Sequence, residues 1–463
     1  MISSRREFLR WLGISAATAT LSSCAVTELQ AKRRQPNIVF ILADDMGWSD
    51  LTCYGSRFHE TPRIDRLAAE GMRFTDAYAA CPVCSPTRAS ILSGQYPAHV
   101  GVTDFITGHW RPYEKLRVPI NRTQYLPLEI VTLAEALQPA GYASAMIGKW
   151  HLGGRDHAPG LQGFDVVQMG GQNRTDKRVT TYTDGALEFI EQNQDKPFFL
   201  YLSHNTVHIP LEAPAELVDK YKNKPKPATG VNNPTYAAMV EHLDSSTGRV
   251  LDKLDELGLR DDTIVIFFSD NGGLRQIYTG NGPIVTTNAP LRDEKGTLYE
   301  GGIREPLIVR WPGVVRPGTE CNTPVTSVDF YPTFLDIAGA GKPKAQPLDG
   351  QSLLPLLHRK GRFQDRALYW HYPHYHHSSP AGAIRAGDWK LIEFFEDGKL
   401  ELYHLRDDLG EENNLAALFP RRTTALQKKL ANWRKSVNAA LPELNPDFDP
   451  ARRAEWGRHP SRS

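Results

Sequence analysis

Two pairs of oxygen-bearing side chains, Asp44-Asp45 and Asp270-Asn271, each follow a short apolar run of the chain. Neighbouring carboxylates repel one another unless a cation neutralises them. A set of oxygen ligands without Cys or His suits Ca²⁺ or Mg²⁺ better than Zn²⁺. Either pair alone could cap a helix or form a turn. Together the two pairs predict a site for Ca²⁺ or Mg²⁺.

Cys81 and Cys84 stand three residues apart in the stretch CPVCSPTRAS. A Cys-X-X-Cys redox site should open a helix behind a thioredoxin-type strand, and the preceding residues 71–80 give that interpretation no distinctive support. The chain has 5 cysteines, and no second close pair completes a zinc site. We expect Cys84 at the end of a strand beside a cleft. The spacing leaves open whether it is a redox thiol, a buried small residue or a residue that is modified.

Further polar clusters contain Lys149 and His151, His208, and Lys295. Each of these residues has an ordinary interpretation when it is taken alone. Lys149 could be a solvated lysine at a strand end, and His208 before Ile209-Pro210 could belong to a turn. Lys295 stands in a run of charged residues that is typical of a protein surface.

The elements that must position these residues show in the apolar pattern. Residues 37–42, 143–147, 198–202 and 264–268 are short apolar runs typical of parallel strands buried on both faces. Helices are expected from Thr132, with Glu135 completing a capping box, and over residues 182–191 and 236–257. This alternation predicts an α/β fold with a mixed, mostly parallel sheet flanked by helices. Ligands bind beyond the carboxyl ends of such strands, where the four clusters that follow these runs fall.

The ends of the chain differ from this pattern. Residues 1–35 are expected to be a signal and linker, because Ser4 to Arg10 resembles a twin-arginine export signal. Leu21-Ser22-Ser23-Cys24 resembles a lipobox, so we expect export to the periplasm or cell surface, with Cys24 as a candidate lipid anchor. Cleavage by an ordinary signal peptidase is the alternative.

A catalytic domain is predicted over residues 36–360. Residues 365–445 alternate like antiparallel strands and close with a helix near residues 424–437, which predicts a smaller C-terminal α+β domain. Residues 446–463 lack periodicity and are predicted to be a flexible tail. The net charge of +1, from 54 basic and 53 acidic residues, argues against a nucleic-acid partner.

The motifs of the chain, taken in order, resemble those of a known protein family. Cys84-Ser85-Pro86-Thr87-Arg88, followed by Leu92-Ser93-Gly94, resembles the sulfatase signature Cys-X-Pro-Ser/Thr-Arg. Six further blocks match in order between Pro36 and about Leu418: PNIVFILADDMGWSD, TPRIDRLAAEGMRFTDAYA, GYASAMIGKWHLGG, SHNTVHIPLEAP, SDNGG and NAPLRDEKGTLYEGGIREPLIVRWPG. The chain thus resembles the formylglycine-dependent type I sulfatases of the alkaline phosphatase-like superfamily, in particular exported bacterial members similar to arylsulfatase A.

The resemblance implies a role for each motif residue. Cys84 would be oxidised to formylglycine by a maturation enzyme, and Asp44, Asp45, Asp270 and Asn271 would hold Ca²⁺. Arg88 and Lys149 would orient and polarise the formylglycine hydrate, whose deprotonation or later collapse His151 would assist. His208 and Lys295 would bind the sulfate near the leaving-group oxygen. The family often has small residues where this chain has Asp293-Glu294, which concerns the substrate rim.

The implied reaction is hydrolysis of sulfate esters, with sulfated saccharides as the expected substrates. Alternatives are a phosphonate monoester or phosphodiester hydrolase that uses the same site, a non-catalytic glycan-binding lipoprotein, and a thiol oxidoreductase. The segment HYPHYHHSSPAG, residues 371–382, holds four histidines whose spacing repeats no common metal-ligand pattern. By resemblance this segment borders the mouth of the site, where its rings could contact a sugar.

Overall fold

The computed structural model describes residues 35–170, 175–227, 230–276 and 284–462. The chain divides after Gln35, and residues 36–463 form one compact unit. The predicted signal and Cys24 lie outside the described residues. Within the described ranges, no helix has both the length and the apolar character that crossing a membrane requires.

The larger sheet has the strand order β10-β2-β8-β7-β1-β6-β4-β5, and β9 pairs with β2. Its centre consists of the four strands predicted from the apolar runs: β7 (Thr263–Ser269), β1 (Asn37–Ala43), β6 (Phe198–Ser203) and β4 (Ala143–Gly148). All three pairings among them are parallel. β8 (Arg304–Arg310) runs antiparallel to β7 and to β2 (Met72–Tyr78). The short strands at the sheet edges are β5 (Val166–Gln168), β9 (Thr319–Cys321) and β10 (Val325–Thr326). The predicted mixed, mostly parallel sheet is confirmed.

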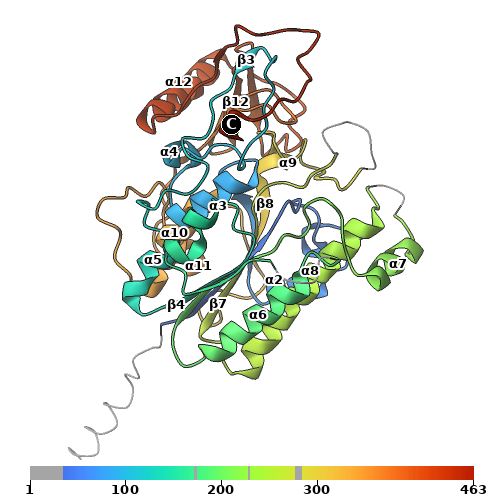
Figure 1. Ribbon diagram of the computed structural model, residues 1–463, viewed down its shortest axis with the longest axis vertical. Helices are drawn as coiled ribbons and strands as arrows, with labels where there is room; N and C mark the ends of the chain where they lie inside the picture. The colour runs from blue at the N-terminus through green and yellow to red at the C-terminus, as the bar shows by residue number, and fades with distance from the viewer. Residues whose placement is uncertain (1–34, 171–174, 228–229, 277–283, 463) are drawn as a thin grey trace, which may run out of the picture. The chain divides into compact units, whose positions relative to one another are not determined.

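Successive residues of the central strands face opposite cores. In β1, Ile38, Phe40 and Leu42 join one apolar cluster, whereas Val39 and Ile41 join the other. The first cluster is covered by helices α3 (Cys84–Ser93), α5 (Leu133–Leu137), α10 (Phe330–Ala338) and α11 (Leu354–Leu357). The second is covered by α2 (Pro62–Ala69), α6 (Val179–Gln192) and α8 (Pro234–Glu256) (Figure 1). Burial on both faces is why these strands are continuously apolar.

Two expected helix features are also present. Thr132 caps α5, and its side chain and that of Glu135 form the predicted capping box. α6 begins before and ends after the predicted segment 182–191. α8 begins before the predicted segment 236–257 and ends at Glu256. Three shorter helices connect the larger elements: α4 (Pro97–Val100), α7 (Ala215–Asn223), which packs on α8, and α9 (Glu300–Ile303).

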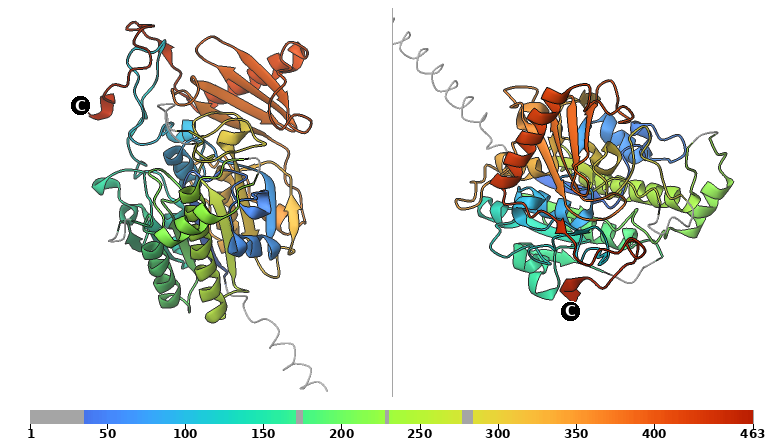
Figure 2. Two further views of the ribbon diagram at one scale, coloured as in Figure 1. Left: turned by 90° about the vertical axis from the view of Figure 1, so that its right-hand side faces the viewer. Right: turned by 90° about the horizontal axis from the view of Figure 1, so that it is seen from above.

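A second sheet follows in the chain and contains four antiparallel strands: β11 (Ala367–Tyr372), β12 (Ala381–Ala386), β13 (Trp389–Phe394) and β14 (Leu400–His404). Helix α12 (Pro420–Ser436) packs on one face through Leu426 and Leu430, as the orange and red elements of Figure 2 show. α12 begins before the predicted position, with Pro420 in its first turn, where the missing N–H costs no helical hydrogen bond. The domain boundaries near residues 360 and 365 stay predictions.

The other face of the small sheet packs against the large domain. Trp370 and Tyr403 share an apolar cluster with Val83 and Leu298, which lie close in sequence to Cys84 and Lys295. The small sheet therefore supports two loops that carry predicted site residues.

Ion pairs without access to solvent join the same two parts. Lys390 of β13 is fully buried and lies 2.9 Å from a carboxylate oxygen of Glu300 and 2.9 Å from one of Glu411. The Tyr78 hydroxyl donates to the second oxygen of Glu300 at 2.6 Å. Arg304 lies 3.2 Å from that second oxygen, so two cations, Lys390 and Arg304, face the two buried carboxylates in the contact between the sheets.

The chain after α12 runs along the loop of residues 108–117. β15 (Glu443–Leu444) pairs with β3 (Leu116–Arg117), and the Asn445 amide donates to the carbonyls of Pro112 and Glu114. Isolated hydrogen bonds, and not a repeating apolar face, make most of these contacts. The sequence therefore shows no hydrophobic periodicity here. The predicted flexibility of residues 446–463 stays a prediction.

We expect Lys390→Ala to lower the free energy of unfolding by about 3–5 kcal/mol, because it leaves buried Glu411 without a counter-ion and leaves Glu300 with Arg304 as its ion-pair partner. Lys222→Ala is the matched control, since Lys222 is exposed and pairs with exposed Asp219. The control should change the free energy of unfolding by no more than about 0.5 kcal/mol. Urea unfolding measures both variants. A loss below about 1 kcal/mol for Lys390→Ala would show that the Glu411 carboxyl group is not charged in the native state.

Candidate active site

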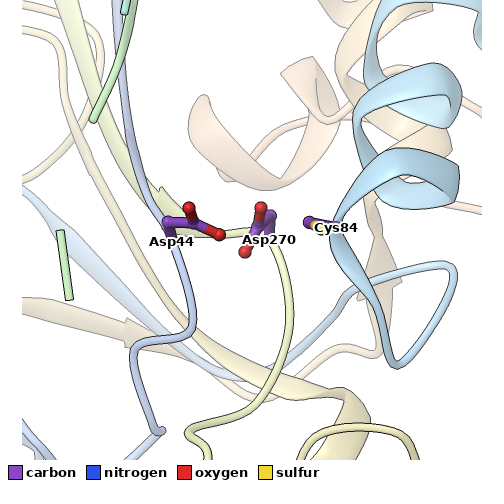
Figure 3. Close-up of side chains that lie close together, drawn as sticks. All are labelled: Asp44, Cys84 and Asp270. Atoms are coloured by element: carbon purple, nitrogen blue, oxygen red, sulfur yellow. The ribbon is translucent and has the colours of Figure 1, made fainter. Parts of the chain in front are cut away.

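The predicted site residues meet at one edge of the large sheet. Asp44 and Asp45 follow β1, Asp270 and Asn271 follow β7, Lys149 and His151 follow β4, and His208 lies beyond β6. Because β7, β1, β6 and β4 are parallel neighbours, their carboxyl ends lie side by side. Cys84 and Arg88 enter from the first turns of α3. Figure 3 shows the side chains of Asp44, Asp270 and Cys84 close together.

Each of the three buried carboxylates has a cationic partner. The closest nitrogen–oxygen distance is 2.7 Å in all three pairs, which are Lys149–Asp44, Lys295–Asp45 and Arg88–Asp270. Burial by itself would raise the pKa of Asp44, but the charges of Lys149, His208 and Arg88 hold it well below its usual range. Burial raises the pKa of Asp270 to about 6, although Arg88 opposes the shift.

The donor set fits a hard divalent cation. The Asn271 amide donates to Asp45 at 2.8 Å, whereas its buried carbonyl oxygen has no hydrogen-bond partner among the described residues. A buried amide oxygen without a partner is costly, and it is a ligand atom that Ca²⁺ and Mg²⁺ prefer. Ligand atoms of Asp44, Cys84 and Asp270 lie within 4.8 Å of one another, as do those of Asp44, Asp45 and His208. In the part of the chain that the structure describes, both such groups belong to this site.

Cys84 is not at the end of a strand, as the sequence led us to expect, but opens α3 and is 1% exposed. Burial raises the pKa of its thiol, and Lys149 and Lys295 oppose the shift only in part. Cys81 is also a buried free thiol whose pKa burial raises. Reactive dithiol sites instead lower the pKa of one thiol. These environments do not favour the thiol oxidoreductase interpretation.

His151 faces Cys84 with an unprotonated nitrogen. Its Nδ1 lies 3.2 Å from the Cys84 sulfur, and its Nε2 lies 2.7 Å from the carbonyl oxygen of Ile106. A carbonyl only accepts hydrogen bonds, so Nε2 carries the proton and Nδ1 presents its lone pair to Cys84. Burial lowers the pKa of His151 to about 3, so the ring is neutral.

His151 and Asp45 both adopt left-handed backbone conformations, with φ of 56° and 64°. For non-glycine residues such conformations cost about 1–3 kcal/mol each, and they concentrate at functional sites. The backbone here is therefore held by its surroundings in a geometry that local propensity does not favour.

His208 lies on the other side of the carboxylates. Its Nε2 is 3.6 Å from Asp45, and its Nδ1 is 2.5 Å from the carbonyl oxygen of Ile209. Burial lowers the pKa of His208, while the charge of Asp45 opposes this shift.

The loop that carries Lys295 is fixed from two sides. The Glu294 carboxylate accepts the backbone N–H groups of Arg275 and Gln276 at 2.6 and 2.8 Å. The His377 ring lies 2.8 Å from the Lys295 carbonyl oxygen. Glu294, part of the departure from the family pattern, thus orders the loop backbone.

The histidine-rich segment packs inward. His371, His374 and His376 are 4%, 2% and 4% exposed, and burial lowers the pKa of each. Three of the four rings are therefore too buried to stack on a sugar. The segment supports the Lys295 loop, because His376 lies against Gly296.

A cleft of about 520 Å³ opens onto four of the predicted site residues, Asp44, Lys149, His151 and His208. Its other lining residues, which sequence reasoning missed, are Lys177, Arg178, Asn205, Ile209 and Glu212. Lys177 and Arg178 come from a loop without apolar periodicity or a known motif, whereas the other three lie in the block SHNTVHIPLEAP without being assigned a role there. Asn205 and Glu212 flank His208 in the sequence, and that proximity is the one signal that could have pointed to them.

Comparisons with known proteins agree with this geometry. The family model described as Sulfatase matches residues 36–340, and the model described as N-sulphoglucosamine sulphohydrolase, C-terminal, matches residues 293–438. A sulfatase of Formosa agariphila is 33% identical over 95% of this chain and 96% of its own length. Human arylsulfatase A is 34% identical over 89% of this chain and 90% of its own length.

A solved structure, that of Ps i-CgsB in complex with k-i-k-neocarrahexaose, is also similar. It superimposes with a TM-score of 0.74 at 27% identity and covers 93% of this chain and 96% of its own. Family model, relatives and fold agree over nearly the whole described chain. The chain therefore belongs to the type I sulfatases and is a sulfuric ester hydrolase.

Proposed function

We propose that the protein hydrolyses sulfate esters of saccharides with a formylglycine derived from Cys84, beside a Ca²⁺ ion, and releases inorganic sulfate. The observation that carries the proposal is the position of Cys84. Within the sulfatase signature, its side chain faces both the unprotonated nitrogen of His151 and the carboxylates of Asp44 and Asp270.

Ca²⁺, or Mg²⁺ as the alternative, would be held by Asp44, Asp45, Asp270 and Asn271. When bound, the ion would supply positive charge that stabilises the sulfate oxygens in the transition state. The formylglycine hydrate would supply an oxygen nucleophile. Every other part of the chemistry falls to the side chains of the protein.

Arg88 and Lys149 orient the reacting group in this proposal. The Arg88 guanidinium is held by Asp270 at 2.7 Å, by the Lys149 carbonyl oxygen at 2.7 Å and by the Ser203 hydroxyl. A guanidinium fixed on three sides keeps its charge in one place and loses little entropy when an anion arrives. The Lys149 ammonium adds a second positive charge beside Asp44.

The two histidines divide the proton transfers. His151 accepts a proton on Nδ1 from the group at position 84, because Ile106 fixes the proton on Nε2. The doubly protonated form of His208, which the charge of Asp45 favours, donates the Nε2 proton to the leaving-group oxygen. Lys295 binds the sulfate between them and is the alternative acid for the leaving group.

Saccharide substrates are supported by the similar structure that holds k-i-k-neocarrahexaose. A phosphonate monoester or phosphodiester hydrolase is the alternative activity, and parallel rates on an aryl sulfate and an aryl phosphodiester separate the two. A glycan-binding protein without catalysis would release no sulfate from any ester.

Export by the twin-arginine route, lipid attachment at Cys24 and conversion of Cys84 by a maturation enzyme complete the proposal. The first two rest on residues 1–24, which lie outside the described part of the chain. Palmitate labelling of the wild type and Cys24→Ala tests the anchor.

Cys84 should be an aldehyde in active protein, which peptide mass spectrometry detects as a loss of mass relative to the thiol. Cys84→Ala should abolish turnover and keep a cooperative unfolding transition, since it removes only one small buried atom. Cys81→Ala is the control and should retain turnover, because Cys81 faces Thr103 and not the cleft. Full activity with an unmodified Cys84 thiol would refute the mechanism.

Removal of divalent ions should abolish sulfate release, and Ca²⁺ should restore it better than Zn²⁺. Ca²⁺ should also raise the melting temperature, because a ligand of the native state stabilises it by about 2.7 kcal/mol at a hundredfold excess over Kd. Asp45→Asn should reduce this rise, whereas Asp261→Asn, at an exposed residue, should not. Full turnover in a preparation shown to be free of metal would contradict the assignment.

His208→Ala should slow a saccharide sulfate far more than an activated aryl sulfate, because only the poor leaving group needs a proton. Loss of a general acid costs about 10²–10⁴ in rate. His151→Ala is the matched comparison and should slow both substrates alike, since it acts on the nucleophile. The measurement is the ratio of mutant to wild-type kcat for each substrate, with chemistry rate-limiting. Equal ratios for both variants would transfer the acid role to Lys295.

A further inference from the structure

The cleft continues beyond the residues that the reaction needs. Past Lys149 and His208, its walls carry two more cations, Lys177 and Arg178, and one carboxylate, Glu212. The catalytic cations Arg88, Lys149 and Lys295 each pair with a buried carboxylate of the site. Lys177, by contrast, forms no ion pair with a carboxylate among the described residues.

The cationic pair is held by a buried neighbour. Asp176, which is 3% exposed, accepts the Arg178 N–H at 2.9 Å and the Thr180 hydroxyl at 2.7 Å. The ring of His242 lies 3.2 Å from the same carboxylate. Lys177 and Arg178 both have left-handed backbones, with φ of 56° and 60°, and both line the cleft. Asp176 thus fixes a turn that presents two successive cations to the same space.

Charge places this pair within reach of the reacting group. Burial lowers the pKa of Lys177, while the charges of Glu212 and Asp44 oppose the shift and that of Lys149 adds to it. Lys177, Asp44 and Glu212 thus line the same cleft, and Lys177 is close enough to both carboxylates for their charges to act on it. Beyond the catalytic residues the cleft carries two cations against one carboxylate, so it favours an anion in addition to the sulfate that is cleaved.

We infer that Lys177 and Arg178 bind a second anionic group, a carboxylate or another sulfate, on the saccharide that carries the reacting sulfate ester. This inference rests on the proposed function and names its substrate class: saccharides with two neighbouring anions. Glu212 competes with that group for Lys177. Lys177 and Arg178 therefore favour binding of the second anion, whereas Glu212 opposes it.

The test uses the full-length enzyme with Cys84 converted. The substrates are galactose, fucose, N-acetylgalactosamine and glucosamine, each as a monosulfate, a disulfate and a monosulfate linked to a uronate, with 4-nitrophenyl sulfate as a reference. On the sugar that the wild type hydrolyses best, we expect at least tenfold higher kcat/KM for a form with two anions. The disulfate and uronate arms distinguish the two sources of negative charge.

Lys177→Gln and Arg178→Gln should each reduce that preference about tenfold, mainly through KM, while the monosulfate changes less than twofold. Glu212→Gln should raise kcat/KM for the form with two anions and leave the monosulfate unchanged. Lys428→Gln, at an exposed position of α12, is the control and should change neither value. A purely structural role for these residues would not produce effects of opposite sign.

Turnover without a preference for the second anion, or an equal loss on both forms in Lys177→Gln and Arg178→Gln, would overturn the inference and leave the proposed function intact. No sulfate release from any saccharide or from the aryl sulfate would instead refute the proposed function, and the inference with it.

Discussion

Three carboxylates, those of Asp44, Asp45 and Asp270, lie without solvent at the ends of two neighbouring strands, and the rest of the site depends on their neutralisation. Uncompensated charges in such a place would cost several kcal/mol each. Each carboxylate has one close cation. These cations are Arg88 of α3, Lys149 after β4, and Lys295 of its loop. The same cations would attract the anionic ester of the proposed function, and the Asn271 carbonyl oxygen, which has no hydrogen-bond partner among the described residues, would be available to the proposed divalent ion.

This constraint explains why a second sheet belongs to the architecture. Lys295 must reach Asp45 from a loop about 250 positions away in sequence, and a mobile loop would pay entropy to keep its ammonium buried. The small sheet restricts that mobility. Trp370 and Tyr403 share an apolar cluster with Leu298 of the loop, and Lys390 forms an ion pair with Glu300 just after it. The buried histidines, which the sequence suggested for sugar contact, serve this support. The ring of His376, whose pKa burial lowers, fills space beside Gly296 without adding charge.

The sequence predicted the strands and the convergence of their polar ends well, because a buried parallel strand must be continuously apolar and must end where ligands bind. The approach of Asp270 to Arg88, or of His151 to Cys84, could not be predicted from local patterns, since such contacts depend on how α3 packs on the sheet. The prediction that Lys295 belongs to the site rested on the family resemblance and not on hydrophobic periodicity. Lys177 and Arg178 had neither signal, because a polar turn held by Asp176 looks like any other loop in the sequence.

The burial of the site also bears on the chemistry of Cys84. A cysteine nucleophile needs a thiolate, commonly paired with a protonated histidine, yet burial raises the pKa of this thiol and lowers that of His151 to about 3. The pair is thus neutral, with the proton on sulfur and a free lone pair on Nδ1. Such an environment is poor for thiolate attack but suits a hydroxyl nucleophile, which needs a neutral base to take its proton as it attacks. The electrostatics that make cysteine unreactive here are those that its oxidised, hydrated form would use.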